Sequence, residues 1–265
     1  MFKLNPCNKL TSTGIYDPLS SIIAERNGAN SLWLSSFSFC LAQGYPDLGL
    51  LPFTAEISTI SRILDVTTVP LIVDIDNGFA SVEHAGVIAK KLDRLGVHAI
   101  CIEDKFSPKK SSLYPDSQEL LPLKEFSQII QRMKREAPNL NIIARLEGLN
   151  YGQTDELINE RISACMNARA DCVLLHNTTA SIDRLKCLIT TNRNVPIGII
   201  PTKYMEKVHS LDNENIVLVV YANQLIRAVH KTIANTMKSL EYKPENIDKE
   251  ISTILEMNML VKKDV

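Results

Sequence analysis

The segment Ile102-Glu103-Asp104-Lys105-Phe106-Ser107-Pro108-Lys109-Lys110-Ser111-Ser112 follows a short apolar run, residues 97–101, that is typical of a buried strand. Two acids and a lysine stand where this strand should end, and a polar, lysine-containing segment follows them. Such a pattern is typical of an active site at the end of a strand, where charges on the strand are fixed and charges on the following loop can move. Many strands end in acidic residues, so the pattern becomes informative only when other strand ends match it.

Eight short, mostly apolar runs alternate with amphipathic helical patterns along the chain. The predicted strands are residues 10–15, 31–35, 69–74, 99–103, 140–145, 171–176, 196–200 and 216–220. The predicted helices are residues 18–27, 54–65, 82–95, 117–136, 154–168, 181–191 and 223–242, with a short last helix at 248–257. The runs are typical of parallel strands buried on both faces. Eight such units, with no GxGxxG after the first strand, favour an α/β protein with a closed (β/α)₈ TIM-type barrel over an open doubly wound sheet.

Composition narrows the class of protein. The chain has 265 residues, 45% of them hydrophobic, and a formal net charge of -1, so one barrel-sized domain is expected, with no nucleic-acid or membrane partner. There is no secretory signal, and the six cysteines are scattered without a CxxC pair, so we expect reduced thiols and a cytoplasmic protein. We assign residues 1–242 to the barrel and 243–265 to a linker and a C-terminal helix that packs on the barrel or on a neighbouring subunit.

Acidic side chains at two strand ends suggest a cation site. Asp74 and Asp76 are two residues apart, so a regular strand would point both to the same face. Together with Glu103 they form an all-oxygen cluster of the kind that suits Mg²⁺. The alternative is that these acids only pair with Arg145 and the loop lysines.

Other strand ends carry groups that could bind an anion. A buried Arg145 needs an anionic partner, which is either a substrate carboxylate or phosphoryl group or a structural ion pair with Glu147 or Glu103. His176 is either a hydrogen-bond donor to substrate or a satisfied core histidine. Residues 35–38 either offer backbone N–H groups to an anion or form an ordinary loop.

The order and spacing of several short motifs carry a resemblance over nearly the whole chain, from about Gly14 to the C-terminal helix. The motifs are Trp33-x-Ser35, Asp47, Asp74-x-Asp76-x-Gly78, Glu103-Asp104-Lys105-x-x-Pro108-Lys109, Ala144-Arg145-x-Glu147, His176, Pro201-Thr202-Lys203-Tyr204 and Ala222-Asn223-x-x-Ile226-Arg227-Ala228. This set resembles the phosphoenolpyruvate mutase branch of the isocitrate lyase superfamily, with phosphonopyruvate hydrolase as a close relative.

The resemblance implies a barrel whose last helix is swapped between subunits, a homotetramer built from dimers, and a Mg²⁺-dependent site for small α-oxo acids. The mutases interconvert phosphoenolpyruvate and phosphonopyruvate, the entry step to phosphonate biosynthesis. Because their equilibrium lies towards phosphoenolpyruvate, the resemblance also implies a downstream enzyme that consumes phosphonopyruvate. By motif, Asp74 would bind Mg²⁺ directly, and Asp76 and Glu103 would act through its waters.

The same resemblance assigns the carboxylate end of the substrate to the segment after the second strand. Ser35 and the backbone amides of Ser36 and Phe37 would bind the carboxylate, and Trp33 belongs to the same substrate-binding motif. The family usually has glycine at the position of Ser36, so the approach of the backbone to the carboxylate is expected to differ here.

At the other end, the resemblance implies that Arg145 and His176 bind the phosphoryl group and that Asp47 lies against it during transfer. Lys109 and Ser111 would belong to a loop that closes over the substrate. With Asp47, Lys109, Ser111, Arg145 and His176 as catalytic residues, transfer would proceed mainly by positioning and charge stabilisation.

The loop departs from the family pattern at one position. The mutases have Asn-Ser where this chain has Ser111-Ser112, the hydrolases have threonine at the position of Ser111, and the lyases have a cysteine general acid in this loop. A serine hydroxyl is far less acidic than a thiol, so lyase chemistry by that route is disfavoured. The leading hypothesis is a phosphoenolpyruvate phosphomutase, because residues 201–204 favour it. A phosphonopyruvate hydrolase or related oxo-acid enzyme is the alternative, and a non-catalytic barrel is a third reading.

Overall fold

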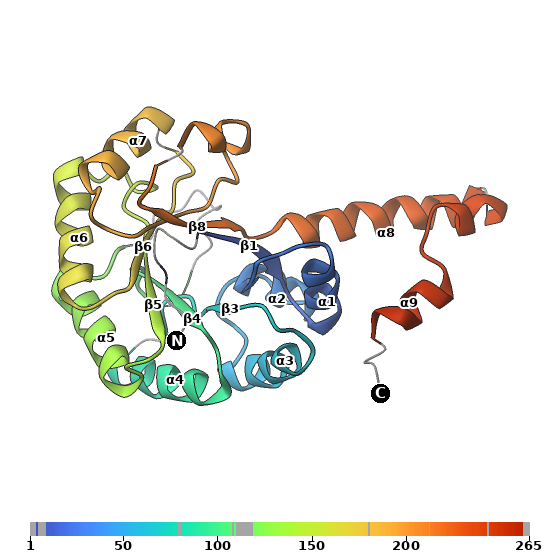
Figure 1. Cartoon of the computed structure of the whole chain (residues 1–265), viewed down its shortest axis with the longest axis horizontal. Coiled ribbons are helices and arrows are strands. Elements are labelled where there is room, and N and C mark those ends of the chain that lie inside the picture. The colour runs from blue at the N-terminus through green and yellow to red at the C-terminus, as the bar shows by residue number, and fades with distance from the viewer. Residues whose placement is uncertain are drawn as a thin grey trace.

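A computed structural model describes residues 4, 9–78, 81–107, 109, 119–179, 181–211, 213–242 and 244–261. Eight parallel strands close into one barrel in chain order, with β8 beside β1 (Figure 1). The strands are β1 (Leu10–Ile15), β2 (Ser31–Leu34), β3 (Leu71–Asp74), β4 (Ala99–Glu103), β5 (Asn141–Leu146), β6 (Cys172–Leu175), β7 (Ile197–Ile199) and β8 (Ile216–Tyr221). The predicted α/β barrel is therefore confirmed.

Helices alternate with the strands along the chain, and those that connect the strands form the outer layer of the barrel (Figure 1). The α-helices are α1 (Pro18–Arg26), α2 (Ser36–Ala42), α3 (Phe53–Val66), α4 (Val82–Leu95), α5 (Leu123–Glu136), α6 (Asp155–Asn167), α7 (Ile182–Thr191), α8 (Gln224–Tyr242) and α9 (Ile254–Leu260). Two 3₁₀ segments are η2 (Met205–Leu211) and η3 (Pro244–Lys249).

Two helical predictions were wrong in their bounds, and one helix was missed. Helix α2 was not predicted; Ser35 begins it by accepting a hydrogen bond from the backbone N–H of Ser38. Helix α5 starts at Leu123, because Pro122 stands at its N-cap and the residue before a proline disfavours helical backbone. The last helix is residues 254–260 and not 248–257, because Thr253 caps it while residues 244–249 form η3.

Side chains alternate between the two faces along the strands; β8 departs from this, because Val217 and Leu218 both pack inside the barrel where its register with β7 shifts. Trp33 and Ile72 pack inside the barrel, whereas their neighbours Leu32 and Leu71 face the helices. The same alternation continues to the strand ends, so Asp74 in β3 follows Ile72 on the inner row. Glu103 and Arg145 extend the inner rows of β4 and β5 in the same way and are paired in register. The barrel therefore delivers its charged strand ends to one place, the carboxyl-terminal mouth.

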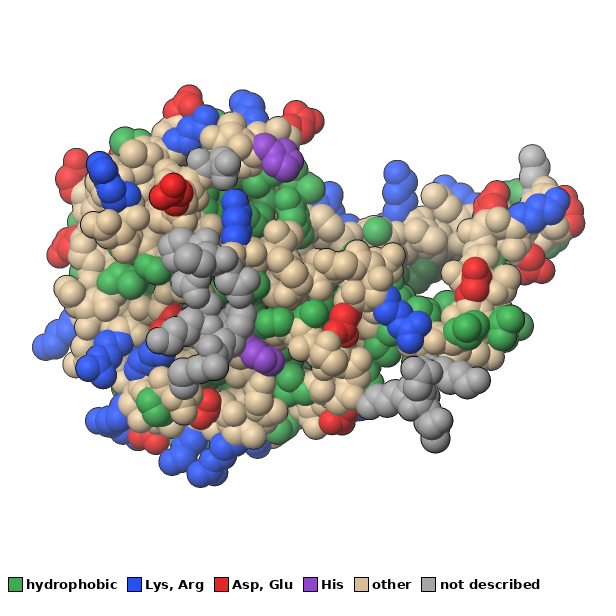
Figure 2. Space-filling model, in the orientation of Figure 1, with side chains coloured by type: hydrophobic (Ala, Val, Ile, Leu, Met, Phe, Trp, Pro, Cys, Tyr) green, Lys and Arg blue, Asp and Glu red, His purple; other side chains and the backbone are tan. Residues whose placement is uncertain are grey.

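The C-terminal part forms an arm that leaves the barrel. Helix α8 projects away from the strands, and α9 folds back towards α1, where Arg26 donates a hydrogen bond to the carbonyl of Met259 at 3.1 Å (Figure 1). Apolar side chains gather at the end of this arm (Figure 2), and Ile254 is 82% exposed. Packing of this segment on a neighbouring subunit stays a prediction. Within the described residues, none of the helices is both long and apolar enough to cross a membrane.

Candidate active site at the mouth of the barrel

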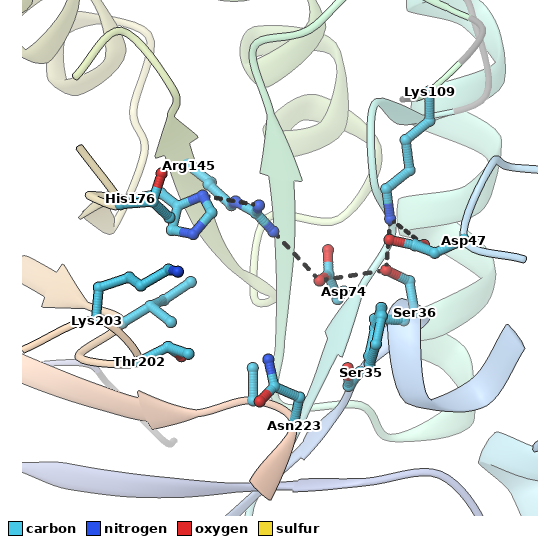
Figure 3. A pocket seen from close by; sticks show the side chains of 14 residues that line it. Ser35, Ser36, Asp47, Asp74, Lys109, Arg145, His176, Thr202, Lys203 and Asn223 are labelled. Carbon is cyan, nitrogen blue, oxygen red and sulfur yellow. Dashed lines mark hydrogen bonds and ion pairs between the residues drawn. The ribbon is translucent and has the colours of Figure 1, made fainter. Parts of the chain in front are cut away.

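A cavity of about 80 Å³ lies at the carboxyl-terminal mouth of the barrel (Figure 3). The residues that line it are Ser35, Ser36, Phe37, Asp47, Asp74, Lys109, Arg145, His176, Thr178, Ile200, Thr202, Lys203, Ala222 and Asn223. The structure thus brings together most of the site residues predicted from the sequence. They come from the ends of seven different strands, β2 to β8, or from the segments that follow those strands, and only the closed barrel makes them neighbours.

Asp74 and Asp76 reach the site by different backbone routes. Asp74 is the last residue of β3, but Asp76 lies in a turn with a left-handed backbone, φ 52°. Aspartate adopts that conformation more readily than most residues, and Gly78 (φ 70°) completes the turn. The Asp76 carbonyl accepts a hydrogen bond from the N–H of Glu103 at 2.7 Å. The regular strand expected through Asp76 therefore ends at Asp74. The turn, and not the alternation of a strand, directs the Asp76 carboxylate towards the site.

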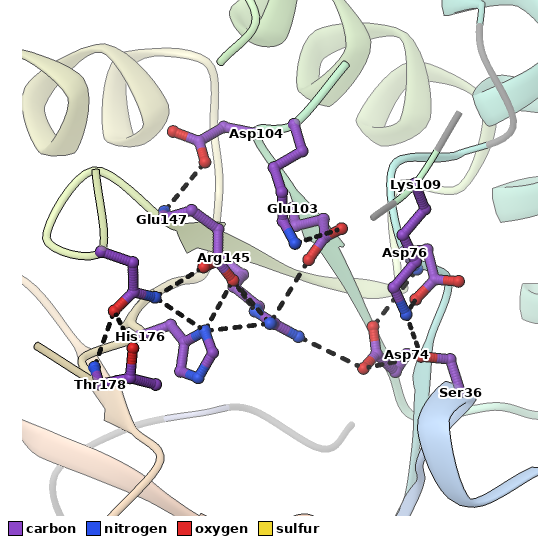
Figure 4. Close-up of polar contacts among 12 residues, drawn as sticks. Ser36, Asp74, Asp76, Glu103, Asp104, Lys109, Arg145, Glu147, His176 and Thr178 are labelled. Atoms are coloured by element: carbon purple, nitrogen blue, oxygen red, sulfur yellow. Dashed lines mark hydrogen bonds and ion pairs between the residues drawn. The ribbon is translucent and has the colours of Figure 1, made fainter. Parts of the chain in front are cut away.

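The Lys109 ammonium joins the acidic side of the site. Its Nζ atom lies 2.6 Å from Asp47 Oδ1, 2.6 Å from Asp76 Oδ1 and 2.9 Å from Ser36 Oγ. Figure 4 shows Lys109 reaching down between Asp76 and Ser36. Burial alone would lower the pKa of Lys109, but Asp76 and Asp47 hold it well above its ordinary value. Lys109 is therefore a fixed cation inside the site.

Arg145 occupies the centre of the opposite side (Figure 4). Its Nε donates to Glu147 Oε1 at 2.6 Å, and its Nη2 lies 3.4 Å from Glu103 Oε2. Its Nη1 lies 3.6 Å from Asp74 Oδ2. Burial opposes the charge of Arg145, but Glu147 and Glu103 more than offset it and raise its pKa well above the ordinary value. The structural ion pair considered for Arg145 thus exists, and the same guanidinium lines the cavity.

A second layer of charge supports these groups. Lys105 Nζ lies 3.2 Å from Glu103 Oε1, and both side chains are fully buried. Asp104 points the other way, accepting from the N–H of Glu147 at 2.9 Å and pairing with Arg161 at 3.2 Å. Burial raises the pKa of Asp104 to about 7. These contacts fix the ends of β4 and β5 behind the cavity.

The carboxylates offer the donor chemistry of a hard cation. Burial, and next the neighbouring charge of Asp76, raise the pKa of Asp74 to about 7, although Arg145 and Lys109 oppose the rise. Within the described residues, the carboxylate oxygens of Glu103 take part in ion pairs with Lys105 and Arg145 but accept no hydrogen bond. The described residues contain no ready-made group of three metal-ligating side chains, because Lys109 and Arg145 occupy the carboxylates instead. The oxygen set fits Mg²⁺ in chemistry, and its role as a metal site stays a prediction.

One predicted site residue lies away from the cavity, and one is not among the described residues. Trp33 is fully buried in the barrel interior and is not part of the cavity wall, so the structure does not bring it to the substrate. Ser111 falls outside the described residues.

Several lining residues were not among the predicted site residues. Thr202 and Lys203 follow β7, and Ala222 and Asn223 follow β8, so the rule that polar strand ends form the mouth already marked both segments. Thr178 follows β6 by the same rule.

Glu56 is a buried acid near the site that gave no sequence signal. It lies in α3, and its Oε2 accepts no hydrogen bond from any residue that the structure describes. Burial and Asp76 raise its pKa to about 8. Only the packing of α3 against the barrel brings it near the carboxylate cluster.

Residues 4–241 match a family model described as phosphoenolpyruvate phosphomutase. The phosphoenolpyruvate phosphomutase of Tetrahymena pyriformis is 27% identical over 94% of this chain and 85% of its own length. The phosphonopyruvate hydrolase of a Variovorax strain is 29% identical over 82% of this chain and 77% of its own. The 2-methylisocitrate lyase of Bacillus subtilis is 32% identical over 60% of this chain and 52% of its own.

Solved structures of the first two kinds of enzyme are similar to this chain in fold. A crystal structure of a phosphoenolpyruvate phosphomutase from Streptomyces platensis subsp. rosaceus superposes with a TM-score of 0.89 at 26% identity, covering 96% of this chain and 90% of that one. A phosphonopyruvate hydrolase in complex with oxalate and Mg²⁺ superposes with a TM-score of 0.87 at 25% identity, covering 95% and 89%. Mutases and hydrolases are thus about equally similar to this chain.

Proposed function

Because the chain belongs to the phosphoenolpyruvate phosphomutase family, within the isocitrate lyase superfamily, we propose that it interconverts phosphoenolpyruvate and phosphonopyruvate. The observation that carries this proposal is the two-sided cavity. Arg145, His176 and Lys203 line one side, and Ser35 and Ser36 line the other, with Asp74 between them (Figure 3). A small acid with a phosphoryl group at one end and a carboxylate at the other matches that arrangement.

The carboxylate of the substrate is assigned to the start of α2. Ser36 and Phe37 are the first two residues of that helix, so their backbone N–H groups have no intrahelical acceptor. Ser35, as N-cap, already accepts from Ser38 and holds this turn in place. The two amides can therefore donate to a carboxylate without breaking a hydrogen bond of the fold.

The phosphoryl group is assigned to Arg145 and His176. The guanidinium suits bidentate binding to phosphoryl oxygens, and its contacts with Glu147 and Glu103 fix its plane. Magnesium, held directly by Asp74 and through water by Asp76 and Glu103, would supply positive charge to the substrate oxygens when bound. A related hydrolase was crystallised with oxalate and Mg²⁺, which supports magnesium as the cation proposed here.

The reaction needs no co-reactant. The O–P bond of phosphoenolpyruvate breaks with its electron pair left on the enolate oxygen, and C3 of the enolate then forms the C–P bond. The transferring group is metaphosphate-like, so the protein acts by positioning and charge. Arg145 and Lys109 face the developing negative charge and would stabilise it. Asp47, fixed by Lys109, would lie against the group in transit.

Hydrolysis of phosphonopyruvate to pyruvate and phosphate is the second candidate. The hydroxyl residue Ser111 at the position where hydrolases have threonine favours it, as does the identity with the Variovorax hydrolase. Residues 201–204 favour the mutase, and Thr202 and Lys203 line the cavity.

Release of pyruvate separates the candidates. With phosphonopyruvate and Mg²⁺, a mutase forms no pyruvate, whereas a hydrolase does, and lactate dehydrogenase with NADH reports it directly. With 2-methylisocitrate, pyruvate release would instead indicate the lyase reaction. We expect neither substrate to yield pyruvate; release from phosphonopyruvate would transfer the proposal to the hydrolase. The homotetramer, the place in phosphonate biosynthesis and a downstream phosphonopyruvate-consuming enzyme remain part of this proposal.

A further inference from the structure

Three polar groups surround one ring nitrogen of His176. Its Nδ1 lies 2.8 Å from Glu147 Oε1, 3.0 Å from Arg145 Nη2 and 3.2 Å from Asn150 Nδ2 (Figure 4). Arginine and the amide nitrogen of asparagine can only donate, whereas an ionised carboxylate can only accept. The position of the proton on His176 therefore depends on which of these contacts is a hydrogen bond.

The orientation of Asn150 is fixed from its other side. Its Oδ1 accepts from the backbone N–H of Thr178 at 2.7 Å and from the Thr178 hydroxyl at 2.8 Å. The amide nitrogen must then face Glu147 and His176, and it donates to Glu147 Oε2 at 2.7 Å. That bond is shorter than the 3.2 Å contact with His176, so Asn150 is committed to Glu147.

Arg145 is committed to Glu147 as well. Both Nε and Nη2 of Arg145 lie 2.6 Å from Glu147 Oε1, closer than Nη2 lies to His176. Burial alone would raise the pKa of Glu147, but Arg145 and His176 hold it well below its ordinary value, so the carboxylate is ionised. The shortest contact of His176 Nδ1 is thus with a carboxylate that accepts, and Nδ1 carries the proton.

The second ring nitrogen is left to face the cavity. His176 lines the cavity wall, and Figure 3 shows Thr202 and Lys203 on the side of the ring away from Arg145. Nε2 forms no hydrogen bond within the described part of the chain. In a neutral ring with the proton on Nδ1, Nε2 carries a lone pair, which repels a phosphoryl oxygen.

Building on the proposed function, we infer that Glu147 is a positioning residue that holds the proton of His176 on Nδ1, and that binding of a phosphoryl or sulfonyl anion brings one further proton to Nε2. The proton comes from solvent and ends between Nε2 and an anionic oxygen of the ligand. Nδ1–H keeps its bond to Glu147, so no bond of the fold is broken. Ligand binding is therefore coupled to the uptake of one proton per subunit.

The charges around the ring explain why the proton arrives only with the ligand. Arg145, Lys105 and Lys203 are cations on three different segments around His176, and Glu147 is the acid in contact with it. Burial lowers the pKa of His176, and Arg145 and Lys105 add to the effect, while Glu147 opposes it. An anion in the cavity would reverse this balance by placing negative charge at Nε2.

A half-buried histidine, His98, provides an internal reference. His98 Nδ1 accepts a hydrogen bond from the backbone N–H of Leu71 at 3.3 Å, so His98 must carry its proton on Nε2. The two histidines are thus expected to be opposite tautomers in one molecule. Long-range ¹H–¹⁵N correlation spectra of the ligand-free, ¹⁵N-histidine-labelled protein distinguish them, with His176→Asn and His98→Asn variants to assign the signals. An Nε2–H tautomer for His176 would overturn the inference.

Proton uptake is measured by isothermal titration calorimetry at about pH 7.5 in buffers of different ionisation enthalpy. Sulfopyruvate is the probe, because its sulfonate cannot itself hold the proton; oxalate, which has no such group, is the control ligand. We expect about one proton taken up per subunit with sulfopyruvate and about none with oxalate. In Glu147→Gln the amide lets either tautomer form, so uptake should fall well below one proton. Sulfopyruvate binding without uptake by the wild-type protein would overturn the inference.

The two tests separate this inference from the proposed function. The tautomer of His176 is read in the ligand-free protein and does not depend on which reaction the site catalyses. Failure to convert phosphonopyruvate would refute the proposed function and leave the tautomer result standing. An unfolded Glu147→Gln variant would likewise leave both wild-type measurements decisive.

Discussion

Lys109 Nζ lies 2.6 Å from Asp76 Oδ1. Lys109 belongs to the segment after β4, and Asp76 lies in the turn after β3 with a left-handed backbone. The contact depends on that turn, because in a continued regular strand the Asp76 side chain would point in a different direction. Lys109 also holds Asp47 at 2.6 Å, so one ammonium compensates two carboxylates.

Replacing Lys109 by methionine should leave Asp47 and Asp76 poorly compensated. Removing one partner of a buried ion pair costs about 3 kcal/mol of unfolding free energy. Urea denaturation in EDTA measures this, and Mg²⁺ should restore part of the loss by replacing the missing positive charge. Lys203→Met is the matched control, because Lys203 lines the same cavity and forms no ion pair within the described residues. An equal loss in both variants would contradict the role given to Lys109.

Asp74→Ala should abolish Mg²⁺-dependent activity while the barrel stays folded, because the residue lies at the mouth and not in the core. Burial and Asp76 raise the pKa of Asp74 to about 7, so its charge opposes folding at higher pH when no cation is bound. In EDTA at about pH 8 the variant should therefore melt no lower than the wild type. Activity as a function of Mg²⁺, with circular dichroism as the folding control, tests this; near-normal turnover would refute the metal assignment.

The barrel and most of the residues at its mouth could be predicted from the sequence, because both depend on patterns within short segments. Apolar runs at regular intervals define the strands, and polar residues just after them define the mouth. Trp33 was misplaced because strand alternation turns it inward below the mouth, which a motif match does not show. Asp76 lies in the predicted site because of a left-handed turn, which its two-residue spacing from Asp74 does not reveal.

The network around Glu147 could not be predicted from spacing. Its partners are Arg145, Asn150 and His176, and the His176 contact joins the ends of neighbouring strands β5 and β6. The sequence marked Arg145 and His176 separately, but only the barrel register brings their side chains to one carboxylate. Glu56 is a similar case, since a buried acid in a helix has no sequence pattern of its own.

Glu56 gives a pH-dependent prediction. Burial and Asp76 raise its pKa from 4.5 to about 8, so the folded protein binds this proton more tightly than the unfolded chain. Unfolding free energy should therefore fall as pH rises from about 5 to about 8, by roughly 1.4 kcal/mol for each unit of the shift. Glu56→Gln should flatten this slope, measured by urea denaturation in EDTA. Glu160→Gln, at an exposed position of α6, should keep the wild-type slope. A wild-type curve that is level across this range would contradict the prediction.

Arg145→Lys should lower kcat/KM by at least about 100-fold. A lysine ammonium cannot span Glu147, Glu103 and the phosphoryl group as the planar guanidinium does. Steady-state kinetics with phosphonopyruvate, together with a melting curve to confirm folding, measures the effect. A loss below about tenfold would mean that Arg145 serves only as a structural ion pair.

Ser111→Asn tests the sequence difference that separates the two candidate reactions. Mutases have asparagine at this position, so the variant should keep or raise isomerisation relative to hydrolysis of phosphonopyruvate. The ratio of phosphoenolpyruvate to free phosphate, quantified for both proteins under the same conditions, gives the answer. An unchanged ratio would mean that residue 111 does not set the outcome of the reaction.

The most direct test of the proposed function is ³¹P NMR of the purified wild-type protein with phosphonopyruvate and Mg²⁺. We expect loss of the phosphonate signal and growth of a phosphoenolpyruvate signal, with no matching growth of free phosphate. Free phosphate without phosphoenolpyruvate would contradict the mutase and identify a hydrolase. An unchanged spectrum would contradict both and direct attention to other oxo acids.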